Sequence, residues 1–539
     1  MLSLSKLLGS AFALLILNFS LSFHNYWPTP WIRLKPELSV EAAAIVLFIA
    51  LHSAFLGPIA ARMRYAIAAL LLALVFGRYL EVTAPALYGR AINLYWDAEH
   101  LPRVLKMIVE ASENWAVAAG AVASTFCIIV LFFGFAWAIN TLSLATKPRI
   151  PRLYLASIAT TVLALYAAGM SSHRITSERW FSIPVGWTYA RQLAFVHDAL
   201  IGEIITNEPA TNPQPSSDLA RLNSRDIYLI FLESYGATVF ADSAHAQRLI
   251  PSFNNLERSA NEHGWQAVSA FYQTPTFGGA SWLSHSTLMT GAWVTEQNQY
   301  QLLLTGNRRT LVQHFKEARY RTVALMPGLR MAWPEGEFYD YDKIWDADSL
   351  DYEGPSFGWW KIPDQYSLAR FYNEEATTND RRPLFGFFAT ITSHMPFTPT
   401  PPYQQDWTRL LSSTPYDEDI TPFTNNSPLD WNNLGPAYAK AIAYDLHLLS
   451  DFLAITAHQG PLIIALGDHQ PPSIVAGTDA PWIVPVHIFA QETELLEPFA
   501  SSGFQKGLYP NGPAVDRLDQ LHGLILRALD SGWQTTHRE

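Results

Sequence analysis

Hydrophobic positions are spread unevenly along this chain of 539 residues, and the longest apolar runs lie in its first third. Each run is close to the ~20 residues that a helix needs to cross the hydrocarbon core of a bilayer. We therefore predict a transmembrane region of five helices over residues 1–175. The expected spans are Leu7–Phe23, Ala42–Ala61, Tyr65–Leu80, Ala116–Leu142 and Leu153–Met170.

Basic residues in the short loops predict the orientation of these spans. The residues that gather on one side are Lys6, Arg62, Arg64, Lys147, Arg149 and Arg152. Such clusters favour the cytoplasmic side, so an odd number of spans leaves everything after Met170 outside. We expect a multi-pass protein of the cytoplasmic (inner) membrane with an extracytoplasmic or periplasmic domain. The first span lacks a small-residue cleavage site and is expected to remain as an anchor.

The pattern changes after the spans. Residues 176–224 form a predicted connector and linker, rich in Asn, Pro, Ser and Thr. From residue 225 to 539, short apolar runs alternate with helical stretches. Continuous apolar runs are typical of strands buried on both faces, which favours an α/β domain with a mainly parallel central sheet covered by helices. The expected strands are Ile227–Leu232, Thr322–Met326, Leu384–Phe388, Leu462–Leu466 and Trp482–Phe489.

Charge and cysteine content narrow the function further. Residues 1–224 carry 16 Lys and Arg against 12 Asp and Glu, whereas the remainder carries 20 against 35. An acidic exposed half argues against a nucleic-acid partner, because such binding depends on clustered Lys and Arg. The single cysteine, Cys127, lies in the fourth predicted span and excludes an internal disulfide.

Metal-binding side chains stand at the ends of two predicted strands. Glu233 follows the first run, and Asp468-His469 follow the run at 462–466. Ligands of parallel sheets bind beyond the carboxyl ends of the strands, so these side chains are expected to meet. Two carboxylates and an imidazole suit Zn²⁺ or Mn²⁺ better than Ca²⁺. The alternative is that Asp468 and His469 cap a helix or bind loop amides.

A hydroxyl stands close to this group in the predicted fold. Ser281 comes just after the pair Gly278-Gly279, where a strand-to-helix turn would hold it. A serine needs a base or a metal to become a nucleophile, and the predicted site supplies both. Thr276, Ser284 or a merely structural helix cap at Ser281 remain the alternatives.

Three segments together resemble the alkaline phosphatase/sulfatase superfamily: Glu233-Ser234-Tyr235-Gly236, Ser281 with Thr290-Gly291 nine residues on, and Gly467-Asp468-His469. They are most similar to its membrane-anchored branch, which contains lipoteichoic acid synthases and phosphoethanolamine transferases. The resemblance implies a sulfatase-like (alkaline phosphatase-like) domain. It also implies that one divalent metal is contacted by Glu233, Ser281, Asp468 and His469.

The departures from the sulfatase signature are informative. Leu283 replaces a proline and His285 replaces an arginine, and both missing residues belong to the signal for conversion to formylglycine. The resemblance therefore implies an unmodified serine that acts on phosphorus. In the related transferases a threonine stands where this chain has Ser281.

Further residues resemble substrate-site positions of that branch. His394 corresponds to a histidine that donates a proton or binds the phosphate, and Trp333 matches a tryptophan of the substrate pocket. That branch also has a histidine and an arginine in the same pocket, but the corresponding residues of this chain are Met326 and Glu335. Arg330 is a candidate to take over the role of the missing residues. His487 is either a substrate- or metal-site residue or a satisfied core histidine.

We expect a metal-dependent transferase that moves a phospho-substituent from a membrane phospholipid donor to an envelope glycan or lipid acceptor through a phosphoserine intermediate. The alternatives are a phosphodiesterase or sulfatase-type hydrolase, and a non-catalytic lipid-binding envelope regulator. Two smaller expectations concern charged pairs. Arg78 and Glu81, three apart on one helix, are predicted to pair, and Asp445 and His447 are predicted polar positions of a packing helix.

Overall fold

The chain divides into two compact units, Met1–Ile204 and Ile205–Glu539, in a computed structural model. The residues described are 4–26, 29, 31–88, 92–93, 97–98, 101–102, 105–106, 109, 114–171, 180–201, 210–211, 214–241, 244–330, 333–357, 362–378, 381–416, 430 and 433–533. Most of the Asn- and Pro-rich part of the predicted linker, from 202 to 213, lies outside these ranges. Each unit is considered by itself below.

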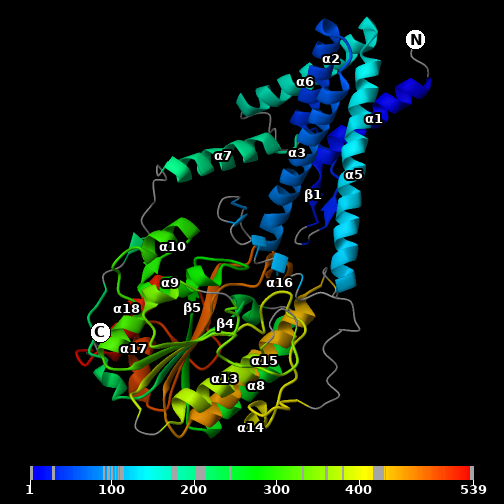
Figure 1. Cartoon of the computed structure of the whole chain (residues 1–539). Helices are drawn as coiled ribbons and strands as arrows, with labels where there is room; N and C mark the ends of the chain where they lie inside the picture. The colour runs from blue at the N-terminus through cyan, green and yellow to red at the C-terminus, as the bar shows by residue number, and fades with distance from the viewer. Residues whose placement is uncertain are drawn as a thin grey trace. The chain divides into compact units, whose positions relative to one another are not determined.

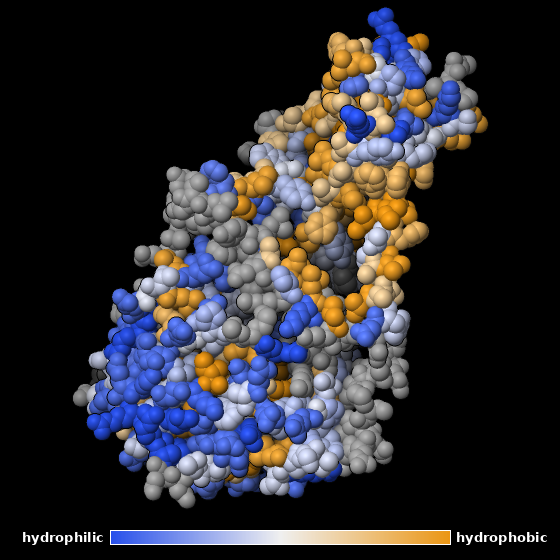
Figure 2. Space-filling model, in the orientation of Figure 1, coloured by the Kyte–Doolittle hydropathy of each residue, from blue (hydrophilic) through white to orange (hydrophobic). Residues whose placement is uncertain are grey.

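The first unit consists mainly of apolar helices. They are α1 (Leu4–Ser22), α2 (Val40–Phe55), α3 (Ala61–Tyr88), α5 (Asn114–Ala145), α6 (Arg149–Ser171) and α7 (Val185–Ile201), with the short strands β1 (His24–Asn25) and β2 (Ile32–Arg33). Each predicted span lies mainly on one helix, but the second, Ala42–Ala61, runs past the end of α2 to the first residue of α3. Within the described ranges, four helices are long and apolar enough to cross a membrane, whereas α2 has only 16 residues. Figure 2 shows hydrophobic residues gathered over these helices.

A buried charge pair sits inside the helices of this unit. The Arg78 side chain is 1% exposed, and its Nε donates to the Phe23 carbonyl at 2.9 Å. Its Nη1 lies 3.3 Å from a Glu81 carboxylate oxygen, which confirms the predicted pair. The other Glu81 oxygen accepts from the Thr188 hydroxyl at 2.9 Å. The pair thus ties α3 to the first turn of α7.

The second unit is built on one mixed sheet. Its order is β12-β5-β11-β10-β4-β9-β7-β8, with β13 paired to β5. The strands are β4 (Ile227–Leu232), β5 (Gln266–Gln273), β7 (Arg321–Leu325), β8 (Lys343–Trp345), β9 (Leu384–Ala389), β10 (Leu462–Gly467), β11 (Ile483–Ala490), β12 (Gln505–Lys506) and β13 (Asp516–Arg517). The block from β10 to β8 is parallel, as predicted. β11 joins it antiparallel, and β5 was not among the expected strands.

Helices cover both faces of this sheet because its central strands are apolar on both sides. In β4, Tyr228, Ile230 and Leu232 belong to one core, and the alternating residues belong to another. Figure 1 shows α8 (Ala244–Glu262), α13 (Asp364–Phe371) and α15 (Gly435–Thr456) over one face. The other face carries α9 (Ser281–Thr290), α11 (Leu311–Glu317), α17 (Thr493–Ser501) and α18 (Leu518–Leu529).

Short elements complete the second unit. They are β3 (Ala210–Thr211) paired with β6 (Ala292–Trp293), and the helices α10 (Gln297–Leu304), α12 (Gly336–Tyr339), α14 (Trp407–Leu410) and α16 (Ser473–Ala476).

Candidate active site

The site begins where two neighbouring parallel strands end. The last register pair of β4 and β10 is Leu232 with Gly467, so Glu233 and Asp468 are the next residues on adjacent strands. A Cβ at Gly467 would lie 1.7 Å from the Tyr235 carbonyl oxygen. Only glycine permits this approach. The two strand ends are therefore held close enough for their carboxylates to share one ligand.

The backbone after β4 is bent sharply to keep this arrangement. Ser234 has a φ of 57°, an unfavourable value for a residue with a Cβ. Its N–H donates to Asp468 Oδ1 at 2.8 Å, and its hydroxyl donates to Glu233 Oε1 at 3.1 Å. The Tyr438 hydroxyl from α15 donates to the Ser234 carbonyl at 2.9 Å. These hydrogen bonds hold the strained residue in place and fix one oxygen of each carboxylate.

A second tight turn presents the serine. Gly278, Gly279 and Ala280 have φ values of 68°, 148° and 62°, and α9 begins at the next residue, Ser281. The Gly278 N–H donates to the Gln470 carbonyl at 3.0 Å, which ties this turn to the segment after β10. The predicted strand-to-helix turn is thus present, and a left-handed alanine precedes the serine.

The serine hydroxyl meets the group at the strand ends. Ser281 Oγ lies 3.0 Å from Glu233 Oε2 and 3.2 Å from His469 Nε2. Ligand atoms of Glu233, Asp468 and His469 all lie within 4.8 Å of one another, and the three side chains are buried. His469 Nδ1 donates to the Gln470 carbonyl at 2.7 Å, which directs Nε2 towards the carboxylates.

The donor set fits a divalent cation. Within the part of the chain that the structure describes, Asp468 Oδ2 is buried and has no hydrogen-bond partner. It lies 3.4 Å from His469 Nε2, and Glu233 Oε1 lies 3.5 Å from the same nitrogen. Buried carboxylates require a compensating charge. Two carboxylates and one imidazole are ligands that Zn²⁺ takes, and the Ser281 hydroxyl stands beside them where a fourth oxygen ligand would lie.

The pKa shifts of Asp468 and His469 also indicate that the buried carboxylates require a positive charge. Burial raises the pKa of Asp468 to about 6, and the negative charge of Glu233 adds to this effect. Burial lowers the pKa of His469, but the carboxylates of Asp468 and Glu233 more than offset this, so the pKa lies above its usual value. A bound cation would relieve the repulsion between the two carboxylates.

The alternative hydroxyls have other partners. Thr276 and Ser284 are buried, and their hydroxyls lie 3.0 Å apart. Ser284 also lies 2.8 Å from the Thr274 hydroxyl, which donates to the Asp468 carbonyl at 2.6 Å. Their role in the described contacts is to brace the turn. Ser281 is the half-buried hydroxyl that reaches the carboxylates.

His394 lies on a loop that is hydrogen-bonded to the backbone of Glu233. The Glu233 N–H donates to the Thr390 hydroxyl at 3.0 Å, and the Ser393 hydroxyl donates to the Glu233 carbonyl at 2.7 Å. His394 Nδ1 lies 2.7 Å from the Met395 carbonyl. Burial lowers the pKa of His394 to about 4, and the charges of His469 and Asp468 also act on it. His394 therefore lies close to the cluster.

The remaining predicted site residues lie further along the sheet edge or in the core. Arg330 is exposed on the loop after β7, and Trp333 stacks on Tyr339 with ring centroids 5.6 Å apart. His487 lies in the middle of β11, with Nε2 3.0 Å from the Tyr235 hydroxyl and Nδ1 2.7 Å from that of Ser269. These are the surroundings of a core histidine. A role of His487 in substrate binding stays a prediction.

Sequence reasoning left His285 undecided. It lies one helical turn after Ser281, and its ring centroid is 4.4 Å from that of Phe231. Burial lowers the pKa of His285 to about 4, and the charges of Asp468 and His469 act on this imidazole too. The four-residue spacing from Ser281 was the available signal, because it places both side chains on one helix face.

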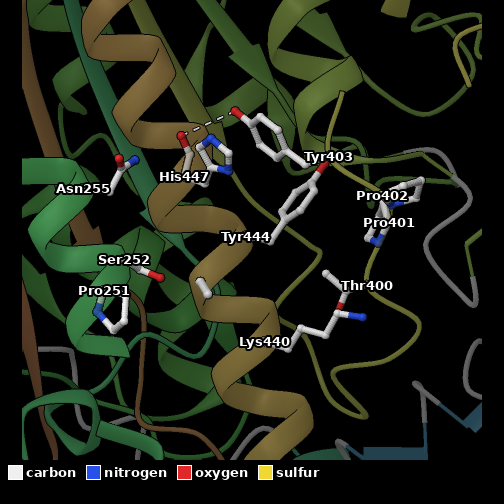
Figure 3. A pocket seen from close by; sticks show the side chains of 11 residues that line it. Pro251, Ser252, Asn255, Thr400, Pro401, Pro402, Tyr403, Lys440, Tyr444 and His447 are labelled. Atoms are coloured by element: carbon white, nitrogen blue, oxygen red, sulfur yellow. Dashed lines mark hydrogen bonds between the residues drawn. The ribbon is translucent and has the colours of Figure 1, made fainter. Parts of the chain in front are cut away.

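Asp445 and His447 lie on the packing helix α15, as predicted. Asp445 is buried beside Ser393 and Asp364, and burial raises the pKa of its carboxyl well above the usual value. His447 stacks on Tyr403 with ring centroids 3.8 Å apart. Figure 3 shows both rings lining a cavity of about 630 Å³.

No protein-family model matches the sequence, and a comparison with curated proteins finds no match. Among solved structures, the lipooligosaccharide phosphoethanolamine transferase A of Neisseria meningitidis is similar over 90% of this chain and 97% of its own, at 11% identity and a TM-score of 0.42. The C-terminal periplasmic domain of EcEptC from Escherichia coli, in complex with Zn, covers 58% and 84%, at 13% identity and 0.38. The lipoteichoic acid synthase LtaP from Listeria monocytogenes covers 52% and 68%, at 14% identity and 0.35. With TM-scores below 0.5 they are similarities only, and the function proposed next rests on the geometry of the site.

Proposed function

We propose that this chain is a metal-dependent transferase that moves a phospho-substituent from a membrane phospholipid to an envelope glycan or lipid. The observation that supports it most is the Ser281 hydroxyl, which lies 3.0 Å from Glu233 and 3.2 Å from His469 at a buried acidic cluster. The apolar helices of the first unit fit an integral protein of the inner membrane. Residues 225–539 would then be the extracytoplasmic or periplasmic catalytic domain.

The first half-reaction uses Ser281 as the nucleophile. Its oxygen attacks the phosphorus of the donor lipid and its proton passes to Glu233 Oε2. The bond from phosphorus to the diacylglycerol oxygen breaks, and that oxygen takes a proton from solvent and leaves as diacylglycerol. A Zn²⁺ or Mn²⁺ ion held by Glu233, Asp468, His469 and Ser281 would lower the pKa of the serine and neutralise charge on the phosphoryl group. N–H groups at the start of α9 face the same phosphate.

The second half-reaction releases the phosphoserine. An acceptor hydroxyl attacks the phosphorus and its proton passes to solvent. The bond to Ser281 Oγ breaks, and Glu233 returns its proton to the serine. With a pKa of about 4, His394 is a neutral imidazole at neutral pH, and in this proposal it hydrogen-bonds the phosphate. Trp333 and Arg330, beyond the carboxyl end of β7, are candidates for holding the transferred headgroup.

Transfer and hydrolysis share this machinery, so the experiment must separate them. The purified full chain in phospholipid vesicles should release diacylglycerol faster when a glycan acceptor is supplied. Mass spectrometry of the Ser281 peptide should show the mass of the donated group. A rate of diacylglycerol release that does not depend on the acceptor would instead favour a phosphodiesterase or sulfatase-type hydrolase. A chain with neither turnover nor adduct would favour the non-catalytic envelope regulator.

The nucleophile has a matched control. Ser281→Ala should lower turnover by roughly a thousandfold or more and remove the adduct. Bound metal should stay close to stoichiometric, because three ligands remain. Ser284→Ala changes a hydroxyl three residues away that only braces the turn, so it should keep most of the turnover. A fully active Ser281→Ala enzyme would rule out the mechanism.

A further inference from the structure

Two cavities of the first unit lie along a single face of helix α6. The first has a volume of about 370 Å³ and the second about 400 Å³. Both fall within the usual range for ligand sites. The α6 residues that line the first are Leu155, Ile158, Ala159 and Val162, and those that line the second are Tyr166 and Met170. Steps of three and four residues place all six on one side of the helix.

The first cavity is apolar along most of its length. Leu14 and Leu17 of α1 and Val46 of α2 face α6 across it. Ala42, Ala43 and Ala159 leave the space that larger side chains would fill. Its polar residues, Asn18, Glu37 and Ser39, gather where α1 ends and α2 begins. The cavity is therefore shaped for a hydrocarbon chain with a polar group beyond one end.

A short backbone pairing joins the two cavities. Leu38 lines the first cavity, Phe181 lines the second, and these residues form a parallel bridge. The Leu38 N–H donates to the Trp180 carbonyl at 2.9 Å, and the Ser182 N–H donates to the Leu38 carbonyl at 3.1 Å. The second cavity thus lies next to the polar end of the first.

The second cavity has the groups that bind a phosphate. Arg191 lines it from α7 and is exposed. Ser182 is 1% exposed, and its hydroxyl has no hydrogen-bond partner among the residues described. A buried donor without a partner is rare and indicates a missing acceptor. Tyr166 and Trp187 complete the lining, and such rings are typical of the boundary between membrane and water.

The buried pair described above keeps this cavity in shape. Arg78 Nη1 lies 3.5 Å from the carbonyl of Ile183, a residue that lines the second cavity. Glu81 accepts from Thr188, one residue after Trp187. The pair therefore positions both the loop before α7 and the first turn of α7. This arrangement holds Arg191 on the cavity.

We propose that the α6 face binds one membrane glycerophospholipid, with an acyl chain in the first cavity and the phosphate in the second, against Arg191 and Ser182. The length of the paired cavities, apolar at one end and cationic at the other, matches an amphiphile rather than a free phosphate or a hydrocarbon. This goes beyond the proposed transferase activity, because binding is expected of a chain that has no turnover.

The test is lipid retention by the purified full chain in detergent, measured by native mass spectrometry with phosphatidylethanolamine and with diacylglycerol. We expect one phosphatidylethanolamine per chain, retained at least tenfold better than diacylglycerol, which lacks the phosphate. Arg191→Gln should weaken retention about tenfold, as the loss of one charge-assisted hydrogen bond implies. Ala159→Phe, which fills the first cavity, should reduce retention of both lipids.

The controls separate this site from catalysis and from general detergent effects. Arg149→Gln removes an exposed arginine at the other end of α6 and should leave retention unchanged. Ser281→Ala should retain the lipid like the wild type, even though turnover is lost. Because Arg191 is exposed, its variant is expected to fold. Equal retention by Arg191→Gln and the wild type, or equal retention of diacylglycerol and phosphatidylethanolamine, would overturn the proposal.

Discussion

Asp364 offers the sharpest test of how the candidate site is held together. This carboxylate is fully buried at the start of α13 and accepts hydrogen bonds from two backbone N–H groups of the loop that carries His394. The Ile391 N–H lies 3.0 and 2.9 Å from its two oxygens, and the Thr392 N–H lies 2.6 Å from one of them. Asp364 therefore fixes the loop without touching Glu233, Asp468 or His469 in any described contact.

The size of the effect follows from these bonds. Asp364→Ala would leave the buried Thr392 N–H and the part-buried Ile391 N–H without this acceptor. At about 1–3 kcal/mol for a buried group, the domain should lose roughly 2–4 kcal/mol of stability. In Asp364→Asn an amide oxygen at the place of Oδ2 still accepts from both N–H groups, but an NH₂ group replaces Oδ1 beside the Ile391 N–H. The loss of stability is therefore about 1–3 kcal/mol. A shift of about 1 Å in the loop is enough to lower kcat by roughly a hundredfold.

The assay compares three readouts of Asp364→Asn with the wild type: kcat for lipid turnover, metal content, and unfolding by urea. We expect kcat to fall by roughly tenfold to a hundredfold while metal content stays near the wild-type value. Asp406→Asn is the matched control, because Asp406 caps α14 through the Thr408 N–H at 2.9 Å but is exposed. Wild-type kcat and stability in Asp364→Asn would refute the reasoning, and so would loss of the metal.

Three further predictions concern packing, pH and catalysis. Gly467→Ala should abolish metal binding and destabilise the domain by several kcal/mol, because its Cβ would meet the Tyr235 carbonyl. The control is Gly306→Ala, whose looser surroundings should leave the protein folded and active. Metal content and circular dichroism check both variants. Burial lowers the pKa of His522 to about 3, so below pH 6.5 the unfolded chain binds a proton that the folded chain does not. The stability that the neutral His522 provides is therefore complete above pH 6.5 and is lost as the pH falls towards 3. His522→Gln should therefore flatten the fall in unfolding free energy between pH 6 and 4 by about 1.4 kcal/mol per pH unit, measured with chelator present; an unchanged slope contradicts this. His285→Phe keeps an aromatic ring but removes the nitrogens that the charges of the cluster act on, so turnover should fall by about tenfold or more with little change in unfolding free energy.

Much of the site was predictable because its strands end abruptly. The apolar runs of β4 and β10 stop directly at Glu233 and at Gly467-Asp468, so the sequence marks both the strand and the edge where ligands gather. The glycine pair before Ser281 marks the turn in the same way. Parallel pairing then brings residues 235 positions apart to adjacent places, which no local pattern shows directly.

Other features could not be predicted, because the residues that form them have no distinctive pattern in the sequence. β5 reads Gln266 to Gln273 with Ser269 in its middle, so it lacks the continuous apolar run that marks the central strands. Asp364 resembles any acidic residue in the first turn of a helix. However, its carboxylate oxygens accept hydrogen bonds from a loop 27 residues later in the chain. His487 shows a polar residue inside a strand, and only the fold reveals that two core hydroxyls satisfy it.

The two strained residues beside the cluster explain why the fold keeps so many hydrogen bonds there. Ser234 and Ala280 both occupy the left-handed region, at about 1–2 kcal/mol each, which is a substantial fraction of the ~5–15 kcal/mol that stabilises a domain. Such conformations persist only where the surroundings over-determine them. Here Asp468 and Tyr438 hold Ser234, and Gln470 holds the turn before Ala280. These hydrogen bonds therefore offset the strain of the two residues and place the Ser281 hydroxyl 3.0 Å from Glu233, which is the preorganisation that the proposed nucleophile would require.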